Sequence, residues 1–214
     1  MLYLFYRLLS HFGPQHWWPA KTPFEVMVGA ILTQNTSWNN VEKAIKRLDE
    51  AGALDPQVIS SMDITQLERL IKPSGFFRVK AARLKALAEY IMVKFHGDVE
   101  AMGLRPGWEL RRDLLSIHGV GEETADSILL YALEKPFFVV DAYTKRILKR
   151  CGLIRGSESY GDIQRLFMDA LPGDVELFKE YHALLVELGK GYCKSRNPRC
   201  EECPLTGEVC QWPR

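Results

Sequence analysis

The sequence predicts an all-α protein, and three observations support this fold class. Apolar side chains recur with the 3.6-residue period of a helix along most of the 214 residues. Apart from a few short apolar runs, there is no sustained two-residue alternation of the kind that half-buried strands show. Glycine, proline and capping residues fall where the periodic segments begin and end.

Local signals place these helices in order along the chain. The first is an amphipathic segment over residues 1–13. Thr22 and Pro23 form a cap and first-turn pair for the next helix, and Thr65 with Glu68 forms a capping box further on. The expected helices cover residues 1–13, 24–34, 41–52, 66–71, 79–97, 108–117, 122–133, 142–150, 160–171 and 176–193.

The composition is that of an ordinary globular protein, with 47% hydrophobic and 26% charged residues. The net charge of +1 does not indicate a nucleic-acid binder, so DNA binding has to be argued from local sites. The first residues lack the basic region and cleavage site of a signal peptide, and no window has the length of a membrane span. We therefore expect a cytoplasmic protein without membrane contact.

A tight turn with two glycines separates two of the expected helices. It reads Gly119-Val120-Gly121, and the second helix follows from residue 122. Glycine suits a backbone that needs positive φ or lies close to another molecule. The first amides of the second helix have no partner within it and attract phosphate. The turn predicts contact with a DNA backbone, although many helical hairpins use such turns and bind nothing.

An aspartate follows the short apolar run at residues 137–140. Asp141 opens the helix expected at residues 142–150 and is well suited to cap it. A capped carboxylate has a fixed direction, and a catalytic carboxylate requires a fixed direction. Both roles are compatible, so Asp141 is the candidate catalytic residue.

Four of the five cysteines lie close together near the C-terminus. In a cytosolic helical protein this grouping indicates a metal site. Four-cysteine zinc sites usually have two close pairs, and only one pair is close here, whereas thiolate-held 4Fe-4S clusters tolerate uneven spacing. Cys151 is left over and is expected to be a small buried side chain. The candidate metal ligands are Cys193, Cys200, Cys203 and Cys210.

Tryptophans gather around two polar segments. Trp17 and Trp18 are adjacent in an expected loop, and Trp38 follows the string Gln34-Asn35-Thr36-Ser37. Adjacent aromatic residues cannot share one helix face, so at least one is expected to be exposed or to line a pocket. The residues fit either packing between two domains or the aromatic walls of a pocket for a flipped base.

The hairpin and the following aspartate resemble the helix-hairpin-helix DNA glycosylases of the endonuclease III superfamily. The cysteine tail extends the resemblance, because the family spacing C-x6-C-x2-C-x5-C differs from this chain by one extra residue before Cys210. The resemblance implies a 4Fe-4S cluster and two helical domains, residues 22–141 and residues 1–21 plus 142–214. Duplex DNA would enter a cleft between these domains, and the protein would act as a monomer.

One position departs from bifunctional endonuclease III. The family reads Gly-Val-Gly-Arg-Lys-Thr-Ala, and this chain has Glu123 where that lysine stands. A carboxylate cannot form a Schiff base with the sugar aldehyde. We therefore predict a monofunctional glycosylase, with Glu123 near the base as a second candidate catalytic residue beside Asp141.

Further strings narrow the resemblance to the 3-methyladenine DNA glycosylases built on the endonuclease III scaffold. They are Trp17-Trp18-Pro19, GAILTQNTSW, Lys72-Pro73-Ser74-Gly75-Phe76 and the glutamates after the hairpin. By this likeness the three tryptophans would line the base pocket. Gln34 would enter the gap left by the flipped base, although a polar residue at a helix end is an equal alternative. Phe76 and Phe77 would wedge the opposite strand or belong to the core, and Lys190 would touch phosphate or lie on a solvated basic face.

These observations predict a base excision repair glycosylase that hydrolyses the N-glycosidic bond of an alkylated base in duplex DNA, with Asp141 stabilising the oxocarbenium ion or orienting water. One alternative is an endonuclease III-type glycosylase and lyase for oxidised pyrimidines, with Lys145 or Lys190 replacing the missing lysine. Another is a non-catalytic iron-sulfur protein that binds DNA through the hairpin.

Overall fold

The computed structural model describes residues 1–207 and 209–210, and all regular elements within them are helical. The all-α prediction is confirmed. Within these residues no helix is long and apolar enough for a bilayer crossing. The chain forms two compact units, the hairpin unit, Ala20–Lys135, and the terminal unit, Met1–Pro19 with Pro136–Arg214. Asp141 belongs to the terminal unit, whereas the predicted range 22–141 ends on it.

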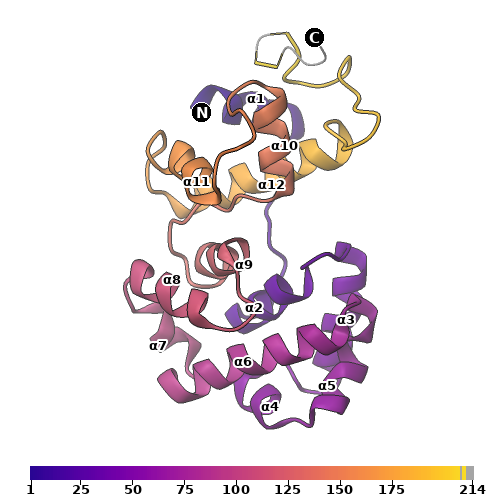
Figure 1. Ribbon diagram of the computed structural model, residues 1–214, viewed down its shortest axis with the longest axis vertical. Helices are drawn as coiled ribbons and strands as arrows, with labels where there is room; N and C mark the ends of the chain where they lie inside the picture. Colours follow the sequence, from indigo (N-terminus) through magenta and orange to yellow (C-terminus); the bar gives the residue numbers. More distant parts are fainter. Residues whose placement is uncertain (208, 211–214) are drawn as a thin grey trace. The chain divides into compact units, whose positions relative to one another are not determined.

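The hairpin unit is built around its longest helix, α6 (Phe77–Phe95), against which α2, α4 and α5 pack (Figure 1). Leu84, Leu87 and Ile91 repeat at helical spacing and are buried on the inner face of α6. The other elements are α2 (Pro23–Leu32), α3 (Trp38–Glu50), α4 (Pro56–Ser61), α5 (Ile64–Ile71), the 3-10 turn η1 (Lys72–Ser74), α7 (Val99–Gly103), α8 (Gly107–Ser116), α9 (Glu122–Ser127) and the π-turn η2 (Ile128–Ala132).

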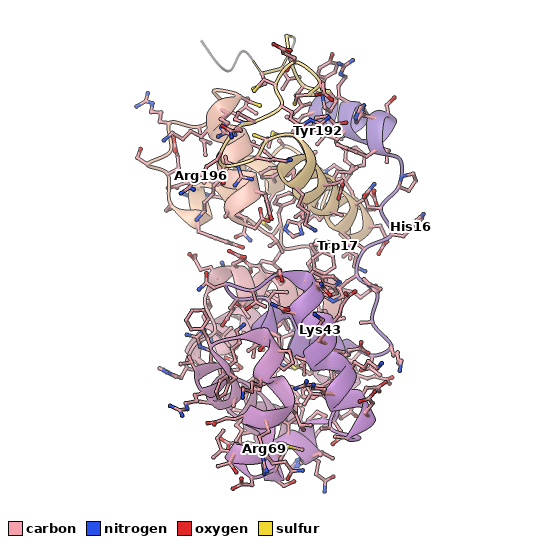
Figure 2. All side chains as sticks on the ribbon, turned by 90° about the vertical axis from the view of Figure 1, so that its right-hand side faces the viewer. His16, Trp17, Lys43, Arg69, Tyr192 and Arg196 are labelled. Atoms are coloured by element: carbon pink, nitrogen blue, oxygen red, sulfur yellow. The ribbon has the colours of Figure 1, made fainter. Side chains whose placement is uncertain are left out.

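The terminal unit is built around α12 (Val175–Gly191), against which α1 (Leu2–Phe12) and α10 (Ala142–Arg150) pack. Its aromatic core stacks Phe138 on the Phe167 ring of α11 (Tyr160–Met168), with a centroid distance of 3.7 Å. Phe178 and Tyr181 meet the Phe138 ring edge-on at 5.5 and 5.8 Å. Figure 2 shows Tyr192 at the end of α12, where its ring packs against His11 and Phe12 of α1.

The N-terminal caps of α2 and α5 can be compared with the caps predicted from the sequence. The Thr22 hydroxyl accepts a hydrogen bond from Glu25 N at 3.1 Å, and Pro23 is the first helical residue, as predicted. The capping box at Thr65 and Glu68 is wrong, because Asp63 caps α5 two residues earlier and accepts from the amides of Thr65 and Gln66. A carboxylate is a stronger acceptor at a helix start than the threonine hydroxyl that follows it.

Other boundaries also differ from the predictions. The helix expected over residues 122–133 is α-helical only to Ser127 and then widens into the π-turn η2, whose residues are all buried. The short helices α4 and α7 were not predicted. Asp55 followed by Pro56 is the same kind of cap and first-turn signal as at Thr22, so α4 was detectable from the sequence.

Candidate functional site

Asp141 is held by the core of the terminal unit. The preceding run packs through Phe138, whose carbonyl accepts from Gln164 Nε2 at 2.7 Å, while the Tyr160 hydroxyl accepts from Val140 N at 3.3 Å. Asp141 then caps α10, with Oδ1 accepting from Thr144 N at 2.7 Å. The predicted cap is therefore present, and it fixes the direction of the carboxylate.

A histidine from α12 faces the second carboxylate oxygen. His182 Nε2 lies 3.7 Å from Asp141 Oδ2, and both side chains are buried. Burial by itself raises the pKa of Asp141, because the anion loses solvation. The neighbouring His182 and the hydrogen bonds from Thr144 outweigh this effect, so the pKa of Asp141 lies below its ordinary value. The carboxylate is therefore ionised at neutral pH.

The segment after α1 brings an aromatic wall to this carboxylate. The Trp17 ring lies 5.8 Å from the His182 ring and 5.8 Å from the Trp18 ring, between centroids. The ammonium of Lys190 in α12 lies 5.5 Å from the ring centroid of Trp17, as a cation–π contact. Trp17 is labelled in Figure 2. The terminal unit thus brings together four of the predicted site residues: Asp141, Trp17, Trp18 and Lys190.

In the hairpin unit, Gln34 is bound to the glycine turn. Its amide nitrogen donates to Gly119 O at 3.3 Å and to Thr124 Oγ1 at 2.9 Å, and its carbonyl oxygen accepts from Arg83 Nη1. The Arg83 side chain lies against Gly119, where an added Cβ would collide with it. Arg83 Nε is buried and has no hydrogen-bond partner among the described residues. Gln34 and the turn therefore form one connected element.

The segment that carries Gln34 is anchored by a lysine that the sequence reasoning missed. Lys80 is 1% exposed, and its ammonium donates to Leu32 O at 2.8 Å, Thr36 Oγ1 at 2.6 Å and Ser74 O at 2.7 Å. Thr36 Oγ1 also donates to Ser74 O. Lys80 occupies a position of the apolar stripe that continues through Leu84. A lysine within the apolar face of a helix is the sequence signal from which this buried lysine could have been predicted.

The turn itself has one glycine that its backbone requires. Gly119 has φ +83°, which favours glycine, whereas Gly121 has φ −91° and open space around its missing Cβ. Val120 is buried and anchors the turn. Among the described residues no side chain caps α9 at Gly121, and Glu123 is exposed in the first turn of α9.

Two further aromatic predictions fall in the hairpin unit. Trp38 begins α3, is half-buried, and donates from Nε1 to Glu42 Oε1 at 2.8 Å. It therefore lies in a different unit from Trp17 and Trp18. Phe76 is 69% exposed at φ +44°, next to the Lys80 anchor, so it does not belong to the core.

The cysteine tail forms one group of thiols. Burial raises the pKa of Cys200, and the nearby Cys193 and Cys210 raise it further. Cys203 is half-buried, and its electrostatic neighbours are Cys193, Cys200 and Cys210. In the described part of the chain, three or more His, Cys, Asp or Glu side chains do not converge on a single ion position. Four thiols in one group fit a 4Fe-4S cluster, because each thiolate there binds a different iron.

Basic and backbone groups complete this loop. Arg150 Nη1 donates to Cys193 Sγ at 3.3 Å. Cys210 N donates to Leu205 O at 2.8 Å, and Gly207 N donates to Cys210 O at 3.1 Å. Cys151 ends α10 half-buried, with its thiol hydrogen-bonded to Cys210 and its pKa raised by burial.

Two family models match the chain. One is described as an HhH-GPD superfamily base excision DNA repair protein and matches residues 28–173. The other is the iron-sulfur binding domain of endonuclease III, and it matches residues 193–208, ending before Cys210. The first match contains the helical hairpin and Asp141, and the second contains three of the four tail cysteines.

Individual relatives agree with these matches. A putative DNA repair glycosylase of Methanocaldococcus jannaschii is 49% identical over 98% of this chain and 96% of its own length. A non-covalent endonuclease III–DNA complex superposes with a TM-score of 0.83, 26% identity and coverage of 98% and 93%. H. pylori 3-methyladenine DNA glycosylase bound to 1,N6-ethenoadenine superposes with a TM-score of 0.76, 29% identity and coverage of 88% and 96%. The chain therefore belongs to the HhH-GPD superfamily of base excision repair proteins, as a DNA glycosylase of the endonuclease III family with a 4Fe-4S cluster.

Proposed function

We propose that this DNA glycosylase releases an alkylated base of the 3-methyladenine type from duplex DNA by hydrolysis, without cleaving the strand. The observation that carries the proposal is Glu123, an exposed carboxylate in the first turn after the hairpin, where the bifunctional enzymes have lysine. A carboxylate cannot form a Schiff base, so the lyase route lacks its nucleophile. The structural likeness to the H. pylori 3-methyladenine DNA glycosylase supports the class of base.

Asp141 supplies the charge that this reaction needs. Breaking the N-glycosidic bond leaves positive charge on the sugar, and an ionised carboxylate held in a fixed direction stabilises that charge or orients the attacking water. The buried setting strengthens the interaction, because few water molecules screen it. A cationic alkylated base leaves readily, so the site requires little acid catalysis.

Trp17 and Trp18 form the proposed aromatic wall for the flipped base within the terminal unit. Flat aromatic walls replace the stacking that a flipped base loses, and they attract a cationic base. Lys190 already lies over one face of Trp17. A cationic base therefore stacks on the other face of Trp17 or displaces the lysine.

The proposed DNA contacts start from the hairpin turn. Gly119, Val120 and Gly121 present backbone to phosphate, the space at the missing Cβ of Gly121 is open, and the guanidinium of Arg83 adds positive charge beside the turn. Gln34, bound to the same turn, fills the gap left by the flipped base. We expect the enzyme to act as a cytoplasmic monomer on duplex DNA, with Lys190 contacting phosphate.

The 4Fe-4S cluster is held, in this proposal, by the four tail cysteines. These cysteines would hold the cluster and thereby tie the tail to the end of α12, and the cluster would supply structure, because hydrolysis of a base requires no electron transfer. Arg150 offsets the negative charge of the thiolates, and Arg146 Nε donates to Cys193 O at 2.7 Å, so α10 is tied to the loop. The proposed ligands are Cys193, Cys200, Cys203 and Cys210.

One specific observation favours an endonuclease III-type alternative. Lys190 lies over Trp17, and Trp17 packs on the histidine that faces Asp141, so a lysine is present in the unit that carries the catalytic carboxylate. Lys145 is a weaker replacement, because its ammonium lies over the Tyr160 ring at 5.7 Å. In this alternative Lys190 forms a Schiff base, and the substrate is an oxidised pyrimidine.

A comparison of substrates tests the proposal. The purified protein is incubated with methylated duplex DNA and with a duplex that carries an oxidised pyrimidine, and the released bases are chromatographed. We expect release of 3-methyladenine from the first duplex and no release after the substitution Asp141→Asn. Release of the oxidised pyrimidine alone would refute the proposed substrate class.

A further inference from the structure

A buried histidine faces the proposed catalytic carboxylate and has no part in the mechanism above. His182 is 6% exposed in the middle of α12, and Asp141 is 9% exposed at the start of α10. His182 Nε2 lies 3.7 Å from Asp141 Oδ2, while Thr144 N binds Oδ1. The two oxygens of Asp141 thus face groups from two different helices.

A buried carboxylate is costly unless hydrogen bonds and opposite charge compensate it. The backbone N–H of Thr144 provides a hydrogen bond to Oδ1, and the N-terminus of α10 adds the partial positive charge of the helix dipole. Oδ2 faces His182. A carboxylate only accepts hydrogen bonds, so the ring nitrogen that faces it carries the proton, and we assign the proton to Nε2 on that ground.

The other cations of the elements around this pair are bound elsewhere. On α10, Arg146 donates to the carbonyls of Gly189 and Cys193, and Arg150 donates to Lys194 O at 2.7 Å. Lys145 lies over the Tyr160 ring. On α1, Arg7 donates to Pro204 O and His11 contacts the Tyr192 hydroxyl. On α12, Lys190 lies over Trp17, and among the described residues the imidazole of His182 is the basic side chain recorded beside Asp141 Oδ2.

We infer that His182 is a positioning residue for base excision, which holds the Asp141 carboxylate ionised and correctly aimed and links it to Trp17. This inference rests on the catalytic role proposed for Asp141. The Trp17 ring packs on the imidazole with 5.8 Å between centroids, so one side chain contacts both the aromatic wall and the carboxylate. Loss of the imidazole therefore affects the reacting carboxylate more than it affects DNA binding.

The test compares two substitutions at this position with one control. His182→Leu removes the donor, His182→Gln keeps a donor near the place of Nε2, and His11→Leu removes an exposed histidine of the same unit. Excision from methylated duplex is measured in single turnovers across pH. For His182→Leu we expect a rate loss of about a hundredfold, as for a small misplacement of a catalytic group. We also expect the acid limb of its pH profile to move to higher pH.

The expected pattern separates positioning from a purely structural role. His182→Gln recovers much of the rate, His11→Leu keeps the full rate, and affinity for a duplex with an abasic-site analogue stays unchanged in all three variants. A His182→Leu protein with wild-type rate and an unmoved acid limb would overturn the inference. A rate loss with an unmoved acid limb, or without recovery in His182→Gln, would also overturn it.

A second readout does not depend on the substrate. The carboxyl ¹³C titration of Asp141, assigned by comparison with Asp141→Asn, is expected to move to higher pH in His182→Leu. If the wild-type protein releases no alkylated base but this titration moves, the proposed substrate fails and the positioning role of His182 stands. If the protein releases the base but the titration does not move, the inference about His182 is wrong.

Discussion

Replacing Lys80 by methionine tests whether one buried ammonium anchors the segment that carries Gln34. Methionine is similar in length to lysine and fills the same space, but it donates no hydrogen bonds. The substitution leaves Leu32 O, Thr36 Oγ1 and Ser74 O without the donor that they share in the hairpin unit. We expect the fold to persist with lower stability and the segment after α2 to become mobile.

The contacts set the size of the effect. An acceptor buried without a partner costs about 1–3 kcal/mol, and three acceptors at the low end give about 3 kcal/mol. Thr36 Oγ1 keeps its contact with Ser74 O, which argues for the low end. For a chain of this length about 3 kcal/mol corresponds to a fall in Tm of roughly 6–12 °C.

Lys85 provides a matched control on the same helix. Its ammonium donates to Ser60 O at 2.9 Å and Met62 O at 2.7 Å, but the side chain is only half-buried, so water replaces it when it is removed. Thermal unfolding and binding to an abasic-analogue duplex are measured for both variants. Lys85→Met is expected to lose less stability than Lys80→Met and to keep its affinity for DNA. Equal losses of stability in the two variants, or unchanged DNA affinity in Lys80→Met, would refute the anchoring role of Lys80.

Three further predictions follow from the same unit. Burial lowers the pKa of Lys80 to about 8, below the unfolded value of 10.5, so the unfolded state binds more protons above pH 8. The unfolding free energy of the wild type, measured in urea, should therefore rise relative to Lys80→Met from pH 8 towards 10, and a constant difference would contradict this. Gly119→Ala should lower Tm, because residue 119 has a positive φ and an added Cβ would collide with the Arg83 side chain. Gly121→Ala should keep Tm and weaken DNA binding, because the space around its missing Cβ is open. Equal losses of Tm in the two variants would contradict this prediction. Glu123→Lys should yield a borohydride-trapped DNA adduct that the wild type lacks, and absence of the adduct would show that a lysine at this position cannot reach the sugar.

Local features of the fold were predictable from the sequence, because they depend on neighbouring residues. Helical periodicity, the Thr22 cap and the position of Asp141 at the start of α10 all depend on residues within one or two turns. The failed capping box at Thr65 shows the limit of such signals, because Asp63, two residues earlier, caps the helix first and accepts from the amides of Thr65 and Gln66.

The contacts that organise the candidate site could not be predicted in this way. Lys80 reaches Leu32, Arg83 reaches Gln34, and His182 faces Asp141, and each pair is far apart in the sequence. Periodicity shows that Lys80 and His182 lie in largely apolar helices, but it does not show which acceptor each one meets. That choice depends on how the helices pack within each unit.

Borohydride trapping on methylated duplex DNA tests the proposed hydrolytic mechanism most directly. The wild-type protein is incubated with the duplex in the presence of borohydride, the free bases are chromatographed, and the protein and DNA strands are separated under denaturing conditions. We expect free 3-methyladenine, an intact strand that carries an abasic site, and no covalent adduct. A covalent adduct that disappears after Lys190→Ala would contradict a monofunctional mechanism and would assign the Schiff base to Lys190.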